Sequence, residues 1–182
     1  MATRKHRTGI VACAVLLLCV IASSAQTKPR IDFDRLLADF PNLPWDFEIR
    51  YVVKDAGSTD MLRIHYDGRT DLVRWNSASA GSLAQVCRSK MSRSDFRKLL
   101  DLFRKNKFND LPTASESLVT VARGTQRIVS VRVGRMIVRK IDRGDLQSPE
   151  LEQLETVLEQ RITAITADSK ATCEMEAVPA KP

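Results

Sequence analysis

The chain has 182 residues, of which 43% are hydrophobic and 28% are charged, and its formal net charge is +7. This composition excludes fibrous, collagen-like and wholly disordered proteins, and the length suits one domain with a substantial core. The sequence shows no internal repeat and no low-complexity block.

The first 25 residues have the pattern of a secretory signal peptide. Three basic residues precede an apolar run over residues 10–21, and small residues follow it up to Ala25. The run is shorter than the roughly 20 residues of a membrane-spanning helix, which argues against the alternative of a permanent anchor. A lipoprotein signal, the other alternative, has its cysteine at the end of the apolar run, whereas Cys13 lies near the start. We therefore expect a secreted or periplasmic protein.

Cleavage after Ala25 predicts that the exported protein begins at Gln26. Removal of the signal peptide takes away three basic residues and no acidic ones. The exported protein then has 26 basic and 22 acidic residues and a net charge of +4. Amino-terminal sequencing of the exported protein should therefore start at Gln26. Finding Met1 or Ala2 at the amino terminus would contradict the prediction.

Two of the four cysteines would leave with the signal peptide, so Cys87 and Cys173 would reach an oxidising compartment as a pair. A disulfide between them would close a loop of roughly 86 residues, which the chain-entropy model values at about 4 to 5 kcal/mol. Cys173, however, lies in a small, polar segment whose composition is typical of disorder, and Cα atoms more than about 7 Å apart cannot bridge. The sequence leaves both the bonded and the free state open.

Residues 26–44 form a lead-in segment in which three apolar residues predict a short helix that ends at Pro41. From Phe47 the hydrophobic period changes to two, which predicts a half-buried strand over residues 47–54.

A hairpin is predicted over residues 60–76 because Asp67-Gly68 suits a two-residue turn. In this register Ile64 lies opposite Asp71, and one face carries Leu62, Ile64, Tyr66, Val73 and Trp75. A longer turn would move these pairings, because a slip of one residue reverses every side chain. A weaker fourth strand follows over residues 82–90.

Residues 91–108 change to helical spacing, with Ser92 as the expected cap. The core-facing stripe of this helix consists of Phe96, Leu99, Leu100 and Phe103. Three short strands over 117–124, 127–134 and 135–142 follow, and a helix over 147–166 closes the domain.

The last two strands form a second predicted hairpin, with Gly134-Arg135 as its turn. Val131 then pairs with Val138 on the core face. The other face presents Ile128, Ser130, Arg132, Ile137, Arg139 and Ile141.

These elements predict an α+β fold: an antiparallel sheet of about six to seven strands with two amphipathic helices packed on one face. Each helix and each alternating strand has one apolar side to bury, and this arrangement buries them together. The single domain covers residues 45–166, and a polar C-terminal tail follows over residues 167–182.

The order of these elements resembles a family of uncharacterised domains in secreted bacterial proteins. The resemblance covers residues 45–166 and rests on FEIRYVV before the Asp-Gly hairpin, SRSDFRKLLDLFRKNKFNDLP, VSVRVGRMIVRKI and ELEQLETVLEQRI. Its most specific motif is F-x-x-L-P, here Phe108 to Pro112. The resemblance implies the fold, export and a bacterial source, and it implies no activity.

The sequence offers little for catalysis. His65 is the only histidine beyond the signal peptide, which excludes most hydrolase triads and zinc sites, and we expect it on the surface. Asp60, Asp67 and Asp71 are close in sequence, but their spacing matches no calcium loop. We expect no enzymatic activity, no metal and no cofactor.

The basic residues are concentrated in residues 88–143, which hold 15 basic and five acidic residues. We expect a non-catalytic interaction domain that binds a protein or envelope component through Arg132, Arg139, Ile128, Ile137 and Ile141. The alternative is a module that uses residues 88–143 to bind a polyanion, namely an anionic glycan, a lipid or a nucleic acid. Nucleic acid is the least expected of these, because no aromatic residues alternate with the basic ones. The concentration of basic residues also has a simpler explanation. They can complement the glutamates of the closing helix within the same domain.

Overall fold

The structure, a computed structural model, describes residues 29–76, 83–112, 125–142, 148–169 and 171–177. The predicted signal peptide with its cleavage position, Ala25 and Gln26, lies outside these ranges, as does the predicted strand over residues 117–124.

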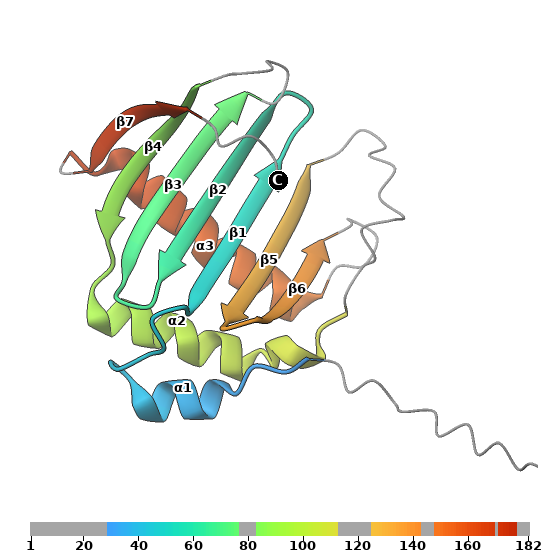
Figure 1. Cartoon of the computed structure of the whole chain (residues 1–182). Coiled ribbons are helices and arrows are strands. Elements are labelled where there is room, and N and C mark those ends of the chain that lie inside the picture. Colours follow the sequence, from blue (N-terminus) through green and yellow to red (C-terminus); the bar gives the residue numbers. More distant parts are fainter. Residues whose placement is uncertain (1–28, 77–82, 113–124, 143–147, 170, 178–182) are drawn as a thin grey trace, which may run out of the picture.

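Seven strands form one sheet in the order β6-β5-β1-β2-β3-β4-β7, and every neighbouring pair is antiparallel (Figure 1). The strands are β1 (Glu48–Lys54), β2 (Ser58–His65), β3 (Arg69–Asn76), β4 (Leu83–Lys90), β5 (Gln126–Val133), β6 (Met136–Asp142) and β7 (Thr172–Ala177). The predicted α+β class with an antiparallel sheet is confirmed.

The helices are α1 (Phe33–Asp39), α2 (Arg93–Lys105) and α3 (Pro149–Ala167), and a short 3-10 helix, η1 (Phe108–Asp110), follows α2. Helices α2 and α3 bury their apolar sides against one face of the sheet, and α1 packs against α2. Figure 1 shows α3 crossing behind the strands and α2 along their lower ends, with α1 below it. Within the described ranges, none of the helices is long and apolar enough to cross a membrane.

Helix α2 begins at the predicted cap, Ser92, and α3 is capped by Ser148. The Ser92 hydroxyl accepts a hydrogen bond from the Asp95 backbone N–H at 3.1 Å, and the Ser148 hydroxyl accepts one from the Leu151 backbone N–H at 3.4 Å. Each cap satisfies an N–H group that has no partner within the helix. The buried stripes of the two helices face one core, together with Ile49, Tyr51, Leu62, Ile64, Leu72, Val129, Val131 and Val138 of the sheet.

The β5–β6 hairpin has the predicted register, with Val131 opposite Val138. Gly134 in its turn has φ +60°, a conformation that glycine adopts without strain. Lys140 also lies on the core face, and its ammonium donates hydrogen bonds to the carbonyls of Leu111 at 2.6 Å and Asn109 at 3.2 Å. These contacts explain how the core accommodates a lysine.

The predicted register of the β2–β3 hairpin is wrong by one residue. The loop has three residues, so Ile64 lies opposite Thr70, and Arg63 rather than Ile64 lies opposite Asp71. Gly68 ends the loop with φ +82°, as in the common three-residue hairpin that closes on a left-handed residue. Thr70 and Leu72 therefore face the helices, and Val73 and Trp75, which were expected in the core, lie on the other face.

Strand β7 lies within the segment expected to be a polar tail, where the sequence pattern predicted no strand. It pairs with β4, and Cys173 lies directly opposite Cys87. The two cysteines form a disulfide bond, with 4.0 Å between their Cα atoms. The alternation typical of a half-buried strand is absent from TCEMEA because this edge strand is exposed along most of its length. The disulfide therefore ties an exposed strand to a buried position of the sheet.

Candidate functional site

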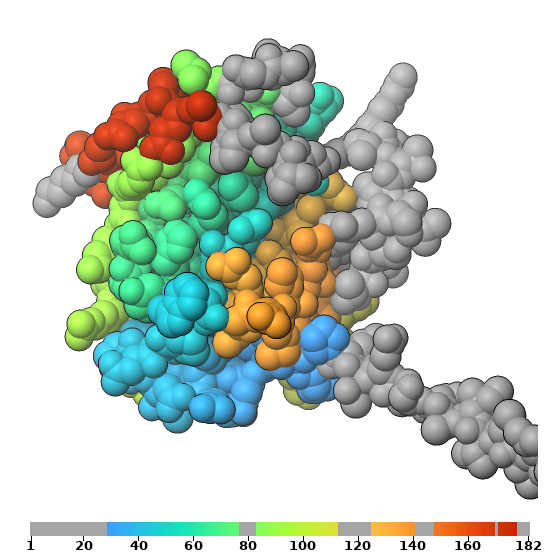
Figure 2. Space-filling model, in the orientation of Figure 1, coloured from blue at the N-terminus to red at the C-terminus, as the bar shows by residue number. Residues whose placement is uncertain are grey.

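The face of the sheet opposite the helices, which we call the open face, carries most of the polar side chains of the strands. Figures 1 and 2 look onto this face. None of the three α-helices in the described part of the chain packs on it, since all three contribute to the core on the other side. Side chains in successive strands form rows across this face.

One of these rows crosses all seven strands and contains four arginines. The register of each strand pair places its members side by side, in the order Arg139, Ser130, Arg50, Arg63, Asp71, Arg88 and Thr172. We call this set the arginine row. It brings together cations from β6, β1, β2 and β4, and it contains one carboxylate.

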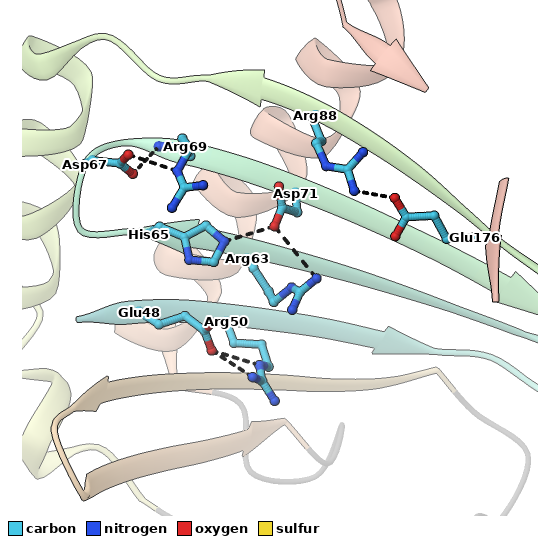
Figure 3. A network of polar contacts seen from close by, with 9 residues as sticks. All are labelled: Glu48, Arg50, Arg63, His65, Asp67, Arg69, Asp71, Arg88 and Glu176. Carbon is cyan, nitrogen blue, oxygen red and sulfur yellow. Dashed lines mark hydrogen bonds and ion pairs between the residues drawn. The ribbon is translucent and has the colours of Figure 1, made fainter. Parts of the chain in front are cut away.

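Carboxylates of other rows on the same face pair with some of these arginines (Figure 3). Arg50 donates two hydrogen bonds, from Nε at 3.2 Å and Nη2 at 2.7 Å, to Oε1 of the buried Glu48. Arg88 pairs with Glu174 at 3.1 Å and with Glu176. These pairs hold the arginine side chains above the strands.

The Arg63 guanidinium has weaker contacts with carboxylates than those of Arg50 and Arg88. Its closest ion pair is with Asp71, at 3.7 Å between Nη2 and Oδ2, which is too long for a hydrogen bond. Its Nε is buried without a hydrogen-bond partner. Asp71 instead bonds His65, with 2.9 Å between Oδ2 and Nε2. The centre of the arginine row therefore has unused donor capacity.

An aliphatic row lies beside the arginine row, two residues further along each strand. It consists of Ile128, Val52, Met61, Val73 and Val86. Ile128 packs with Val52, and Val73 and Val86 pack with Met61, so the row forms two small clusters. Val52 and Met61 remain half-exposed. Ile128, Val73 and Val86 are buried, so only part of the aliphatic row is exposed beside the arginine row.

Four of the five residues predicted to form a binding surface lie on this face, namely Arg132, Arg139, Ile128 and Ile137, but they are not equally accessible. Arg132 and Arg139 are exposed, and Ile137 is 49% exposed. Ile128 is only 7% exposed, because it packs against Val52 in the aliphatic row. The side chain of Ile141 lies outside the described part of the structure.

Sequence reasoning missed Arg50, Arg63 and Arg88 as parts of this surface. Alternation along β1 places Arg50 on the polar face of its strand, which is a usable signal. The row itself depends on β1 lying between β5 and β2, and no local pattern encodes that neighbourhood.

The other candidate residues do not converge on one site. Asp67 accepts hydrogen bonds from Arg69 in the hairpin loop, and Asp60 pairs with Arg74 on the helix-covered side. Of these three aspartates, Asp71 is the one that hydrogen-bonds His65. Among the described residues no group of three or more histidine, cysteine, aspartate or glutamate side chains is placed to hold a metal ion.

The basic segment 88–143 does not form one surface in its described parts. Arg132 and Arg139 lie on the open face, whereas α2 packs on the opposite side and its Lys105 pairs with Asp101 of the same helix at 2.7 Å. The cations of the open face come from strands throughout the sheet. The relevant grouping is therefore the arginine row and not the basic segment.

A second polar cluster lies between the sheet and α3. Glu159 Oε1 accepts hydrogen bonds from the Tyr51 hydroxyl and from Arg127 Nε, each at 2.9 Å. Arg127 and Glu159 also line a cavity of about 170 Å³ with Ser148, Leu151, Glu152, Glu155 and Thr156. Burial and the adjacent Glu159 carboxylate raise the pKa of Tyr51 well above its ordinary value. A phenol that holds its proton so firmly is a poor proton donor or base, and here it stabilises the contact between β1 and α3.

The raised pKa of Tyr51 predicts a loss of stability at alkaline pH. A tyrosine in the unfolded chain ionises near pH 10. Above that pH the unfolded state therefore binds fewer protons than the folded state, and the free energy of unfolding falls as pH rises. Tyr51→Phe should remove this component, although the lost hydrogen bond should cost about 0.5 to 1.5 kcal/mol at neutral pH. Urea unfolding at pH 8 and pH 11 measures both effects, and equal alkaline losses in the two proteins would contradict the prediction.

No protein-family model matches the chain, and no curated protein matches it.

Proposed function

We propose that the protein is an exported, non-catalytic interaction domain that binds a protein partner of the cell envelope through the open face. The observation that carries this proposal is the contrast between the two faces of the sheet. One face packs against the helices, and the other carries the arginine row beside a partly buried aliphatic row. Polar side chains spread in rows over seven strands suit a contact surface, whereas catalytic sites are usually concave.

Two observations support export. The signal-peptide pattern of residues 1–25 is the first. The second is the disulfide between Cys87 and Cys173, because disulfides form and persist in oxidising compartments. The resemblance to uncharacterised domains of secreted bacterial proteins agrees with both.

Site-specific photo-crosslinking tests the proposal. A photo-reactive residue at Ile137, which is 49% exposed on the open face, should crosslink to a partner in the native cell envelope. The matched control is Val157, which is 37% exposed on α3 and therefore faces away from the open face. An adduct from Ile137 and none from Val157 supports the proposal. Adducts from Val157 alone, or equally from both positions, would overturn it.

A second candidate function is polyanion binding, which the four arginines of the arginine row favour. Charge-led binding weakens steeply as salt rises, because bound counterions are released. Retention on heparin that falls with ionic strength and is lost on replacing Arg63 and Arg88 with glutamine would support this function over the first.

A further inference from the structure

We propose that one end of the open face, where β1 begins and the β5–β6 hairpin turns, binds the surface of an anionic phospholipid bilayer. The site consists of Trp45, Ile137, Arg132 and Arg135, and we call it the tryptophan patch. The proposal goes beyond the proposed function, because it assigns a lipid contact that does not require the protein partner.

The order of the strands places the hairpin residues of the patch beside the start of β1. Because β1 and β5 are antiparallel, Glu48 at the start of β1 lies beside Arg132 near the end of β5. Arg132 lies opposite Ile137 across the hairpin, so their side chains are neighbours on the open face. Arg135 belongs to the turn that joins the two strands.

The segment that leads into β1 packs on the same turn. A side-chain carbon added at Gly134 would lie 3.3 Å from Oδ2 of Asp46, so the loop and the turn approach closely. Trp45 precedes Asp46 and therefore lies beside the hairpin. Figure 2 shows the two segments, in light blue and orange, next to each other on the open face.

The apolar members of the tryptophan patch are exposed to solvent. Trp45 is 80% exposed and Ile137 is 49% exposed, unlike the buried members of the aliphatic row. A tryptophan ring is apolar with one polar N–H, which is why tryptophan is enriched at membrane–water interfaces. Insertion of both side chains between lipid headgroups would remove apolar surface from water, which stabilises the bound state.

The cations of the tryptophan patch are free to meet lipid phosphates. Arg132 and Arg135 are exposed, and neither guanidinium forms an ion pair with a described residue. Glu48 lies beside Arg132, but it is buried and its Oε1 accepts two hydrogen bonds from Arg50. Asp46 is only half-exposed. Each basic residue near an anionic bilayer strengthens binding about fivefold, so the two arginines together should contribute more than about tenfold.

The combination of exposed apolar and cationic side chains favours a bilayer over a glycan. A bilayer presents phosphates at its surface and hydrocarbon directly beneath them, so it matches both kinds of side chain. An anionic glycan would bind the arginines but would offer no apolar phase to Ile137. Trp45 and Ile137 come from a loop and from a strand next to a turn, and a bilayer surface can deform around such groups.

Flotation with lipid vesicles tests the contact on the purified exported protein. Vesicles made of equal parts phosphatidylglycerol and phosphatidylcholine should bind the protein at least about tenfold more tightly than vesicles of phosphatidylcholine alone. Binding should weaken as salt rises, because salt screens the charge of the bilayer surface.

The variant Trp45→Ala tests the apolar contribution. It should weaken binding to the anionic vesicles at least about fivefold, because the tryptophan ring is the largest apolar group of the patch. The matched control is Met175→Ala, which removes a side chain that is 61% exposed on β7, towards the other end of the sheet. This control should change the affinity less than about twofold.

The variant Arg132→Gln, Arg135→Gln tests the charge contribution and should weaken binding at least about tenfold. The charge-matched control Arg93→Gln, Arg97→Gln removes two exposed cations from α2, on the other side of the sheet. This control should change the affinity less than about twofold. All substituted side chains are exposed, and a melting temperature near that of the unmodified protein shows that each variant is folded.

Tryptophan fluorescence reports whether Trp45 itself enters the bilayer. The chain has two tryptophans, so Trp75→Phe leaves Trp45 as the only one. The emission of this variant should shift to shorter wavelength on binding anionic vesicles, and lipids with brominated acyl chains should quench it. Vesicle binding without either change would show adsorption through another surface and would overturn the site.

The remaining outcomes separate the lipid contact from its alternatives. Equal binding to anionic and neutral vesicles, or unchanged binding by Arg132→Gln, Arg135→Gln, would overturn the role of the arginines. A shift of Trp45 emission with heparin and none with vesicles would show a glycan site instead. If no vesicle binds while Ile137 still crosslinks to a protein, the lipid contact is wrong and the proposed function stands. If vesicles bind through the patch and Ile137 gives no protein adduct, the proposed function fails and the lipid contact stands.

Discussion

Val131→Asp should unfold the protein at room temperature. Val131 is completely buried on β5, opposite Ile49 of β1 and Val138 of β6. An aspartate there would be a buried carboxylate without a partner, and the desolvation of a charge costs far more than that of a neutral group. Domains of this size are stable by about 5 to 15 kcal/mol, so the substitution should remove most or all of the free energy of unfolding. Circular dichroism should show no cooperative thermal transition.

The neighbouring face supplies the control for Val131→Asp. Arg132 and Arg139 are exposed on the open face, so their replacement with serine should change the free energy of unfolding by about 1 kcal/mol or less. That change corresponds to a shift of a few degrees in the melting temperature. A native-like Val131→Asp protein together with an unfolded Arg132→Ser, Arg139→Ser protein would show that the register of β5 is wrong by one residue.

Removing the disulfide should give the second-largest loss of stability. Cys87 and Cys173 are 86 residues apart, and the chain-entropy model values a closed loop of that length at about 4 to 5 kcal/mol, with measured losses often smaller. The Cys87→Ala, Cys173→Ala variant should therefore unfold at a lower urea concentration. Hydrogen exchange should rise first in β7, because β4 is its one neighbour among the described strands.

Reductant provides an internal control for the disulfide. It should lower the stability of the unmodified protein towards that of the double alanine variant, and it should leave the variant unchanged. Thiol labelling of the unfolded, unreduced protein should modify neither Cys87 nor Cys173. Labelling of both would show that the exported protein lacks the bond.

Local patterns predicted the elements whose partners are adjacent in sequence. The β5–β6 hairpin follows its alternation and its glycine turn, so Val131 and Val138 pair as expected. The register predicted for the β2–β3 hairpin was wrong because Asp67-Gly68 fits a two-residue and a three-residue loop equally well. Only the packing of Thr70 and Leu72 against the core distinguishes the two loops.

Features that depend on distant pairing could not be predicted. Strand β7 lacks alternation, and its position depends on pairing with β4 and on the bond to Cys87. The arginine row likewise requires β1 to lie between β5 and β2, segments more than 60 residues apart in sequence. Alternation predicted the face of the sheet on which each residue of β1 and β5 lies. Which residues of other strands lie beside it follows only from the order of the strands.

The order of the strands also determines how two copies of the sheet could meet edge to edge. Among the strands that the structure describes, the outermost are β6 and β7, and they carry opposite charges, since β6 exposes Arg139 and β7 exposes Glu174. Joining two β7 edges, or two β6 edges, would bring like charges together across the new strand pair, which is destabilising. A symmetric dimer through either edge is therefore disfavoured. Only a head-to-tail contact would match the charges, and such a contact, repeated from copy to copy, extends a sheet without closing it.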